Sequence, residues 1–433
     1  MINRTLLAAS AIALALPVAT PVAAAPFDAS EPTGLSSGVD HGLGFAYVDP
    51  QLASIVKNRT AQPRMSLLQN AGFELGGLRQ QQQDAPNLIY LQLRDGLERY
   101  QATWGQLPRV QIPAGAALKT GSAGERVDML RLRLGLPAGG GFDGPLGQRV
   151  TEYQRVHGLK VTGIADSATI DSLNLGADHY LQRIAVNLER ARRLPDAGQF
   201  GRYVVVDSGA AEVHLISGDR IADSMRAVVG SPEHKTPMMA VMMQNAKVNP
   251  YWNVPPDLIR RLTAPRVLKN GVSYLKNFRY EVLPDWKPTS QPIDPASVDW
   301  NDVLAGKTNI RVRQLPGGGN SMGAIKFETP NRFGIYLHDT PKKELFASAN
   351  RWVSNGCVRL EDARRFASWV FGAMPQAEGA EAQVNLPQPV PVYMTYLTVA
   401  AGPNGVTFRS DPYNYDAVAA QRLFSAPQQM ASL

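Results

Sequence analysis

The sequence of 433 residues contains a single cysteine, Cys357, within the stretch SNGCVRL at 354–360. A lone thiol cannot form an internal disulfide, and outside the cytosol it is exposed to oxidation and mispairing. Free cysteines are often buried as small hydrophobic residues, but here Asn355 and Gly356 precede the thiol and Arg359 follows it, in a polar, turn-like setting. We predict that Cys357 is a reactive nucleophile. A position just ahead of a helix and beside an arginine also predicts an acidic thiol.

A thiol nucleophile needs a base, and the six histidines lie at positions 41, 157, 179, 214, 234 and 338. His338 is the candidate, because it ends a strand-like run 19 residues before Cys357 and functional sites collect where strands end. His157 precedes a glycine that looks like a helix terminator, which indicates a structural role. His214 alternates with apolar residues in AEVHLIS, which is typical of a half-exposed strand. No metal-ligand spacing, P-loop or dinucleotide fingerprint is present, so we expect no metal and no cofactor.

Two kinds of element must position these residues. After Cys357, the spacing predicts a helix whose apolar face is formed by Ala363, Phe366, Ala367 and Val370. From Gly201 onward, apolar residues alternate between Gly, Ser and Asp breaks, which predicts consecutive antiparallel strands. Residues 254–320 interrupt this β pattern with helix-like and Pro-rich stretches and end in a glycine run at 317–319 that is typical of a hinge.

A compact helical unit is predicted over residues 121–176. The first two helices have expected apolar faces, formed by Val127, Leu130 and Leu134 in one and by Leu146, Val150 and Tyr153 in the other. A third helix is expected to be capped by Asp166 or Ser167 and to run to Leu173. The unit contains no group of residues of the kind that forms a catalytic site. Two interpretations remain open: it binds glycan or stem peptides, or it is a spacer whose groove is blocked.

The stretch GIYLHDTPKKELFASANRWVSNGCVRL resembles the signature of L,D-transpeptidases, in which a Ser-x-Gly-Cys-hydrophobic-Arg block follows a histidine. MRAVVGSPEHKTPMM and NPYWNVPPDLI resemble the catalytic domain of the large, multidomain branch that carries a substrate-capping insertion. The helical unit resembles a peptidoglycan-binding module, and VPVYMTYLTVAAGPNGVTFRSDPYNYD resembles that branch's C-terminal tail. Together the resemblance covers about residues 88–416. Three residues depart from the family pattern: Asn355, where many members have His or Ser; Asp339, where smaller members have Gly; and Asp166, which replaces a Gly of the module.

The resemblance and the patterns together predict an α+β multidomain protein. A β-rich catalytic domain with a helical insertion is expected after a small all-α module. The expected parts are a signal peptide (1–24), an N-terminal segment that is partly disordered (25–86), a scaffold helix and loop (87–120), the peptidoglycan-binding-like module (121–176), a connecting helix (177–200), the catalytic domain (201–400) with its capping insertion (about 254–320), and a C-terminal tail (401–433).

The resemblance implies 3-3 crosslinking of peptidoglycan stem peptides through a thioester on Cys357, with His338 as base and D-alanine as leaving group. A tetrapeptide donor, an amine acceptor and inhibition by carbapenem-type β-lactams are implied with it. The oxyanion and orienting candidates are Gly356, Asp339 and Tyr336, together with the amide of Cys357. The substrate-binding candidates are Arg359, Ser354, Asn355 and Trp252. The insertion is likewise expected to act as a lid over the site. The alternative is a large surface insertion that has no lid role.

Other functions stay open beside this one. One alternative is an L,D-carboxypeptidase, in which water reaches the thioester before an amine does. Another is a non-catalytic protein that binds the cell wall through the helical module alone. A papain-like protease places its cysteine before its histidine, the reverse of the order here.

The signal-peptide pattern predicts an exported protein of the periplasm or cell envelope without a transmembrane segment in the mature chain. The net charge of +7 comes from scattered residues, which argues against nucleic-acid binding.

Overall fold

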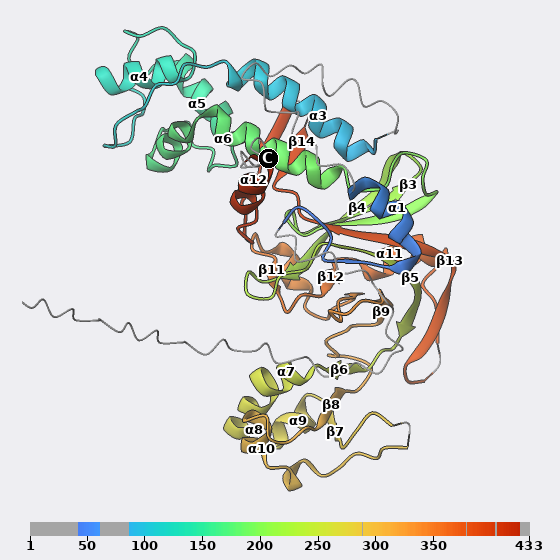
Figure 1. Ribbon diagram of the computed structural model, residues 1–433. Coiled ribbons are helices and arrows are strands. Elements are labelled where there is room, and N and C mark those ends of the chain that lie inside the picture. Colours follow the sequence, from blue (N-terminus) through green and yellow to red (C-terminus); the bar gives the residue numbers. More distant parts are fainter. Residues whose placement is uncertain (1–41, 61–85, 288, 378, 403–404, 425–433) are drawn as a thin grey trace, which may run out of the picture. The chain divides into compact units, whose positions relative to one another are not determined.

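The computed structural model describes residues 42–60, 86–287, 289–377, 379–402 and 405–424 (Figure 1). The predicted signal peptide, residues 1–24, lies outside the described residues, as do residues 25–41 and 61–85 of the predicted N-terminal segment. The described part of that segment has regular structure. It contains β1 (Tyr47–Val48), which pairs in parallel with β5, a turn at Pro50–Leu52 and α1 (Ala53–Thr60). Within the described parts of the chain, no helix is both long and apolar enough to cross a membrane.

The helical region begins with α3 (Leu88–Tyr100), which continues as a π-helical turn at Gln101–Gly105. The next helices are α4 (Glu125–Arg133), α5 (Gly144–Val156) and α6 (Ser167–Ala191). The predicted apolar faces are confirmed, because every residue named for them is buried. Asp166 caps α6 by accepting a hydrogen bond from the Thr169 amide at 2.9 Å. A kink at Gly176, where φ is +80°, separates the predicted third helix from the predicted connecting helix within α6.

The strand-rich region is built on one ten-stranded sheet with the strand order β1-β5-β13-β2-β3-β4-β12-β10-β9, and β11 pairs with β4 off this path. The strands besides β1 are β2 (Arg202–Asp207), β3 (Glu212–Ser217), β4 (Arg220–Gly230), β5 (Met239–Val248), β9 (Ile325–Glu328), β10 (Leu337–His338), β11 (Trp352–Ser354), β12 (Val358–Leu360) and β13 (Ala382–Thr395). Because β9 also pairs with β5, the hydrogen-bonded path closes on itself. The antiparallel run β2-β3-β4 is confirmed. The parallel pairs β13-β2 and β10-β12 were not predicted.

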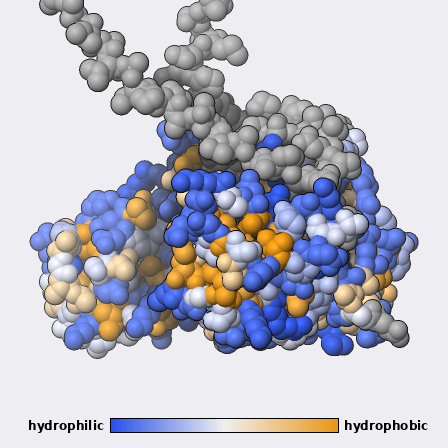
Figure 2. All heavy atoms as spheres, turned by 90° about the horizontal axis from the view of Figure 1, so that it is seen from below, coloured by the Kyte–Doolittle hydropathy of each residue, from blue (hydrophilic) through white to orange (hydrophobic). Residues whose placement is uncertain are grey.

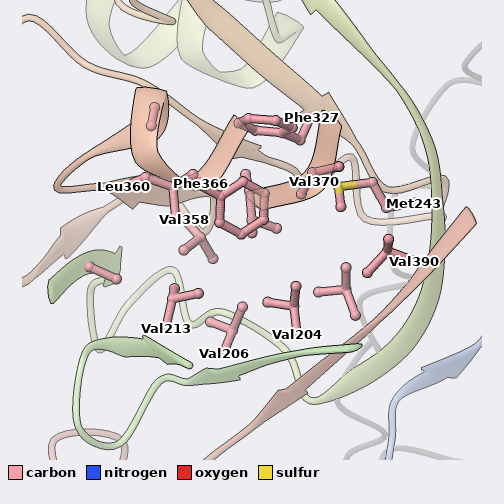
Figure 3. Close-up of a cluster of buried hydrophobic side chains, with 14 of the residues drawn as sticks. Val204, Val206, Val213, Met243, Phe327, Val358, Leu360, Phe366, Val370 and Val390 are labelled. Atoms are coloured by element: carbon pink, nitrogen blue, oxygen red, sulfur yellow. The ribbon is translucent and has the colours of Figure 1, made fainter. Parts of the chain in front are cut away.

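Helix α11 (Ala363–Phe371) fills the space enclosed by these strands. Asp362 caps it by accepting from the Arg365 amide at 2.8 Å, and Gly372 ends it in a left-handed conformation. The four predicted apolar residues of the helix are all buried. Figure 3 shows Phe366 and Val370 among side chains of β2, β3, β5, β9, β12 and β13. The predicted helix therefore forms, and it fixes the inner face of the strands that carry the site.

The insertion has its own core and its own sheet. Its elements are β6 (Trp252–Val254), α7 (Pro256–Leu258), a π-helical turn at Ile259–Thr263, α8 (Ala264–Asn270), α9 (Ser273–Asn277), β7 (Tyr280–Leu283), α10 (Trp300–Leu304) and β8 (Arg311–Gln314). The strands pair in the order β6-β8-β7. Two hydrogen bonds hold the ends of the insertion together. The Asn320 side chain donates to the Pro250 carbonyl at 3.1 Å, and the backbone N–H of Asn249 donates to the Ala324 carbonyl at 3.0 Å.

The C-terminal residues pack into both larger regions. The hairpin of β14 (Val399–Gly402) and β15 (Gly405–Phe408) contributes Val399, Val406 and Phe408 to the core of the helical region. Helix α12 (Asp416–Phe424) follows, and Asp416 pairs with Arg190 of α6 at 2.7 Å. At the surface, Figure 2 shows hydrophobic side chains gathered near the middle of one face and bordered by hydrophilic ones.

Candidate active site

The predicted base ends strand β10, and the predicted nucleophile directly precedes β12, the parallel neighbour of β10. Leu337 of β10 lies opposite Val358 of β12, and both are fully buried in the core of the sheet. Successive side chains of a strand point to opposite faces. His338 and Arg359, the next pair along the two strands, therefore share the other face of the sheet, and Tyr336 and Cys357 directly precede the two strands. The pairing thus brings together four of the residues that the sequence singled out.

His338 is held by a hydrogen bond to the next residue. Its Nδ1 lies 2.5 Å from the backbone oxygen of Asp339, so Nδ1 carries the proton and donates. No partner for Nε2 is found in the described residues. Burial, followed by the positive charge of Arg359, lowers the pKa of His338 from 6.5 to about 3. The imidazole is therefore neutral at physiological pH, and its Nε2 lone pair is available to accept a proton.

The Asp339 side chain fixes the carbonyl that orients His338. One carboxylate oxygen lies 2.7 Å from Lys343 Nζ, and the other accepts from the Ala324 amide at 2.9 Å. Gly323 packs directly against this carboxylate, and a Cβ at that position would lie 2.3 Å from an oxygen of Asp339. Asp339 is thus held on two sides, which fixes the backbone beside His338 in one orientation.

Cys357 is half-buried, and its Sγ lies 3.7 Å from the Gly334 carbonyl oxygen. Burial raises the pKa of the thiol, while hydrogen bonds from Tyr336 and the charges of Lys326 and Arg359 act in the opposite direction. The prediction of an acidic thiol is therefore wrong. The physical reason is desolvation, and the expected helix does not begin directly after the thiol, because β12 intervenes and α11 starts only at Ala363.

The turn before Cys357 is closed by a serine hydroxyl. Ser354 Oγ donates to the Cys357 carbonyl at 2.7 Å and accepts from the Gly356 amide at 3.1 Å. The Gly356 amide, one of the two predicted oxyanion donors, is thus already bonded to a side chain. The Cys357 amide has no acceptor among the residues that the structure describes. Asn355 is exposed at the tip of the turn.

The remaining predicted residues divide into two groups. Arg359 is half-buried beside His338, and its guanidinium has no ion-pair partner within the described chain. Burial raises the pKa of Tyr336 well above its ordinary value, so its hydroxyl remains a donor toward Cys357. Trp252, by contrast, lies in the insertion, where it pairs with Gln314 and packs against the Tyr280 ring at 6.1 Å between centroids.

The sequence reasoning missed a charged pair on the same face. Lys326 of β9 lies opposite His338, its Nζ is 2.9 Å from Glu328, and the same atom is 4.3 Å from the centre of the Tyr336 ring. The signal was present in the alternation of the strand IKFE, which puts both charges on one face. It could be used only with the knowledge that this strand lies beside the one that ends in His338.

Comparison with protein families gives two matches. Residues 201–384 match the L,D-transpeptidase catalytic domain, and residues 132–173 match a family described as "Putative peptidoglycan binding domain". A curated protein of Haemophilus influenzae, named "Putative L,D-transpeptidase", is 33% identical over 244 residues. That match covers 54% of this chain and 48% of the relative, so the chain spans about half the length of this relative.

Solved structures give weaker similarity. An L,D-transpeptidase from Xylanimonas cellulosilytica is 14% identical, with a TM-score of 0.19, and the match covers 65% of this chain and 98% of that one. L,D-transpeptidase 3 from Mycobacterium tuberculosis is 13% identical, with a TM-score of 0.23 and coverage of 45% and 61%. The same enzyme with a faropenem-derived adduct is 14% identical, with a TM-score of 0.22 and coverage of 45% and 60%. Similarity of this degree supports no structural conclusion about this chain.

Proposed function

We propose, from the premise that residues 201–384 are an L,D-transpeptidase catalytic domain, that the protein forms 3-3 crosslinks between peptidoglycan stem peptides. The reaction runs through a thioester on Cys357 and releases D-alanine. The observation that supports the proposal is the parallel pairing of β10 with β12, because the neutral imidazole of His338 ends one strand and the protonated thiol of Cys357 directly precedes the other. The proposed site of action is the cell envelope, and the proposed partners are a tetrapeptide donor stem and an amine acceptor.

Acylation is the first step. His338 Nε2 takes the thiol proton as sulfur attacks the carbonyl carbon that precedes the terminal D-alanine. The C–S bond forms, and the carbonyl electron pair moves to oxygen, which accepts a hydrogen bond from the Cys357 amide. The C–N bond then breaks, its electron pair stays on the departing nitrogen, and His338 returns the proton to that nitrogen. D-alanine leaves, and the acyl group remains on sulfur.

Transfer to the acceptor is the second step. The side-chain amine of another stem attacks the thioester carbon, and His338 takes the proton that the amine loses. The C–S bond breaks, its electron pair goes to sulfur, and the proton on His338 restores the thiol. The thioester conserves the energy of the original peptide bond, so the crosslink forms without ATP. If water attacks instead, the net reaction is that of an L,D-carboxypeptidase.

The electrostatics of the site fit a nucleophile that is activated only during the reaction. A thiolate and an imidazolium are both disfavoured by burial at rest. The Tyr336 hydroxyl, Lys326 and Arg359 all stabilise the thiolate once the proton has moved. A neutral resting thiol also reacts slowly with oxidants, because the thiolate is the reactive form. This property suits a free cysteine that works outside the cytosol.

Intact-mass analysis tests the proposal directly. The protein is incubated with a purified disaccharide-tetrapeptide and, separately, with a carbapenem. We expect one adduct per chain in each case, and none on a folded Cys357→Ala variant. Addition of a second stem should convert the first adduct into a crosslinked dimer. An adduct on Cys357→Ala would contradict the mechanism, whereas acylation followed only by release of the disaccharide-tripeptide would identify the carboxypeptidase.

A further inference from the structure

Two buried hydroxyl groups connect the C-terminal residues with the peptide bond that precedes Cys357. Thr236 lies in the segment between β4 and β5, and Tyr413 lies between β15 and α12. Both side chains are buried, at 0% and 1% exposure. Neither residue belongs to the motif around the nucleophile. Their hydroxyls nevertheless lie within two hydrogen bonds of it.

The direction of every bond in this connection is fixed by its partners. Thr236 Oγ1 donates to the Gly356 carbonyl at 2.7 Å and accepts from the Gly230 amide at 2.9 Å. The Tyr413 hydroxyl donates to the Gly230 carbonyl at 2.7 Å and accepts from the Thr236 amide at 3.2 Å. Because carbonyls only accept and amides only donate, each hydroxyl has one donor and one acceptor role, and both roles are used.

The Gly356 carbonyl belongs to the same peptide unit as the Cys357 amide. In a trans peptide the C=O and N–H groups lie in one plane and point in opposite directions. A hydrogen bond to the carbonyl therefore fixes the direction of the amide on the other side. It also polarises the peptide unit, which makes the N–H a stronger donor. The Cys357 amide is the one we assign to the oxyanion.

We propose that Thr236 is a positioning residue that aims the Cys357 amide at the oxyanion, and that Tyr413 holds Thr236 in place. The inference rests on the proposed acyl transfer. Gly356 has a φ of +114°, a conformation that glycine adopts readily. Because glycine has the most flexible backbone, this peptide unit needs a hydrogen bond to hold it in one orientation. Ser354 restrains the turn from one side, and Thr236 restrains it from the other.

The segment that carries Thr236 is clamped by further contacts. Gly230 approaches it so closely that a Cβ there would lie 2.1 Å from the His234 carbonyl oxygen. Lys235 Nζ donates to the Tyr413 carbonyl at 2.8 Å and lies 4.4 Å from the centre of the Tyr415 ring. The C-terminal residues therefore hold this segment through both a hydroxyl and a backbone carbonyl.

Tyr413 is itself fixed by a neighbouring tyrosine. Its ring stacks on Tyr396 with 4.9 Å between centroids and 13° between planes. Its amide donates to the Tyr396 hydroxyl at 3.0 Å, and that hydroxyl donates to Asp411 at 2.5 Å. The connection from the C-terminal residues to the nucleophile is thus made of groups with single, defined positions.

The test compares Thr236→Val, which removes the hydroxyl at nearly constant shape, with Thr236→Ser, which keeps it. Acylation by a carbapenem is measured over a range of concentrations, to separate the maximal rate constant from the apparent dissociation constant. For Thr236→Val we expect a rate constant lower by about 10- to 100-fold, below the full loss of one oxyanion donor, and a dissociation constant near that of the wild type. Thr236→Ser should recover most of the rate. Alkylation by iodoacetamide, which needs the thiol but no oxyanion donor, should be unchanged in both.

A direct observation of the amide is also possible. Because the chain has one cysteine, labelling with ¹⁵N-cysteine gives a single amide resonance. Thr236→Val and Tyr413→Phe should both shift this resonance, and Thr236→Ser should leave it near its wild-type position. Tyr413→Phe leaves the Thr236 side chain unaltered and removes only the hydroxyl that accepts from the Thr236 amide, so it tests the proposal if Thr236→Val does not fold. A wild-type protein that no carbapenem acylates would refute the proposed function. Normal acylation together with an unchanged rate and an unmoved resonance in these variants would refute the positioning role alone.

Discussion

At the scale of single residues, the candidate site keeps its acid and its base uncharged. Burial raises the pKa of Cys357 and lowers the pKa of His338 to about 3, so proton transfer between them is unfavourable at rest. This differs from a thiolate-imidazolium pair, in which the thiol pKa lies far below its ordinary value. The difference has a measurable consequence for the dependence of thiol reactivity on pH.

We predict that the rate of Cys357 alkylation by iodoacetamide rises continuously with pH and has its midpoint above about 8.5, the ordinary thiol pKa. The sign follows from the raised pKa, because less thiolate is present at any given pH. Lys326→Gln should move the curve to still higher pH, because it removes a positive charge that favours the thiolate. A plateau of high reactivity between pH 5 and 7 would contradict the neutral pair.

We predict that His338→Ala lowers carbapenem acylation at neutral pH by on the order of 10²-fold or more, the usual effect of losing a general base. At high pH the solvent removes the thiol proton, so the difference from wild type should shrink. His214→Ala is the matched control, since His214 lies on β3 and bonds Ser224 at 2.8 Å. If the acylation rate of His338→Ala were unchanged, the base would have to be sought elsewhere, with His234 as the next candidate in the domain.

At the scale of elements, the insertion has its own core, and its two ends lie close together where it joins the main sheet. Its buried residues form a cluster distinct from that of the main sheet. The Asn320 side chain bonds the Pro250 carbonyl and so brings the two ends of the insertion together. A unit of this kind can be removed between these two residues without cutting the strands of the main sheet.

The proposed role of the insertion is that of a lid, which excludes water so that the thioester persists until an amine arrives. We predict that joining Pro250 to Asn320 through a short linker harms crosslinking more than it harms acylation by a small β-lactam. The β-lactam reacts through ring strain and depends less on a closed cleft. Crosslinked dimer, disaccharide-tripeptide and β-lactam adduct are quantified by mass spectrometry. Equal losses in a folded variant, or full crosslinking, would each contradict the lid.

At the scale of the whole molecule, the helical module shares its core with the C-terminal hairpin. Phe408 of β15 lies against the rings of Tyr100, His157 and Tyr180. His157 bonds Tyr100 and the Tyr153 carbonyl and is buried, which agrees with the structural role predicted for it. This packing favours the scaffold interpretation of the module, because it ties the module to the residues that follow the catalytic sheet.

We predict that Phe408→Ala lowers the free energy of unfolding by about 3–5 kcal/mol, the usual cost of a large cavity in a packed core. The measurement is denaturant unfolding of the full chain. Phe278→Ala is the control, because the Phe278 side chain is 53% exposed and its loss should cost about 0.5 kcal/mol or less. A loss at Phe408 no larger than that of the control would show that the module and the hairpin are not one cooperative unit.

Local patterns predicted the helices well, because apolar spacing and capping residues act over a few positions. The faces of α4, α5 and α11 and the cap at Asp166 are examples. Long-range pairing was out of reach: nothing near His338 indicates that β10 lies between β9 and β12. The same limit explains why Lys326 and Thr236 were missed and why the thiol was predicted to be acidic. Burial depends on strands that are distant in sequence, and burial decides the pKa.

The place of β13 in the sheet has a consequence for biosynthesis. This strand lies between β5 and β2, and it begins 134 residues after the end of β5, at 382 against 248. Translation proceeds from the N-terminus at about 5–20 residues per second. Until residue 395 has left the ribosome, β2 and β5 both lack their shared neighbour, and Tyr413 follows later still. Cys357, the proposed nucleophile, is therefore synthesised before β13 and Tyr413, the parts that complete the sheet and hold the segment beside it.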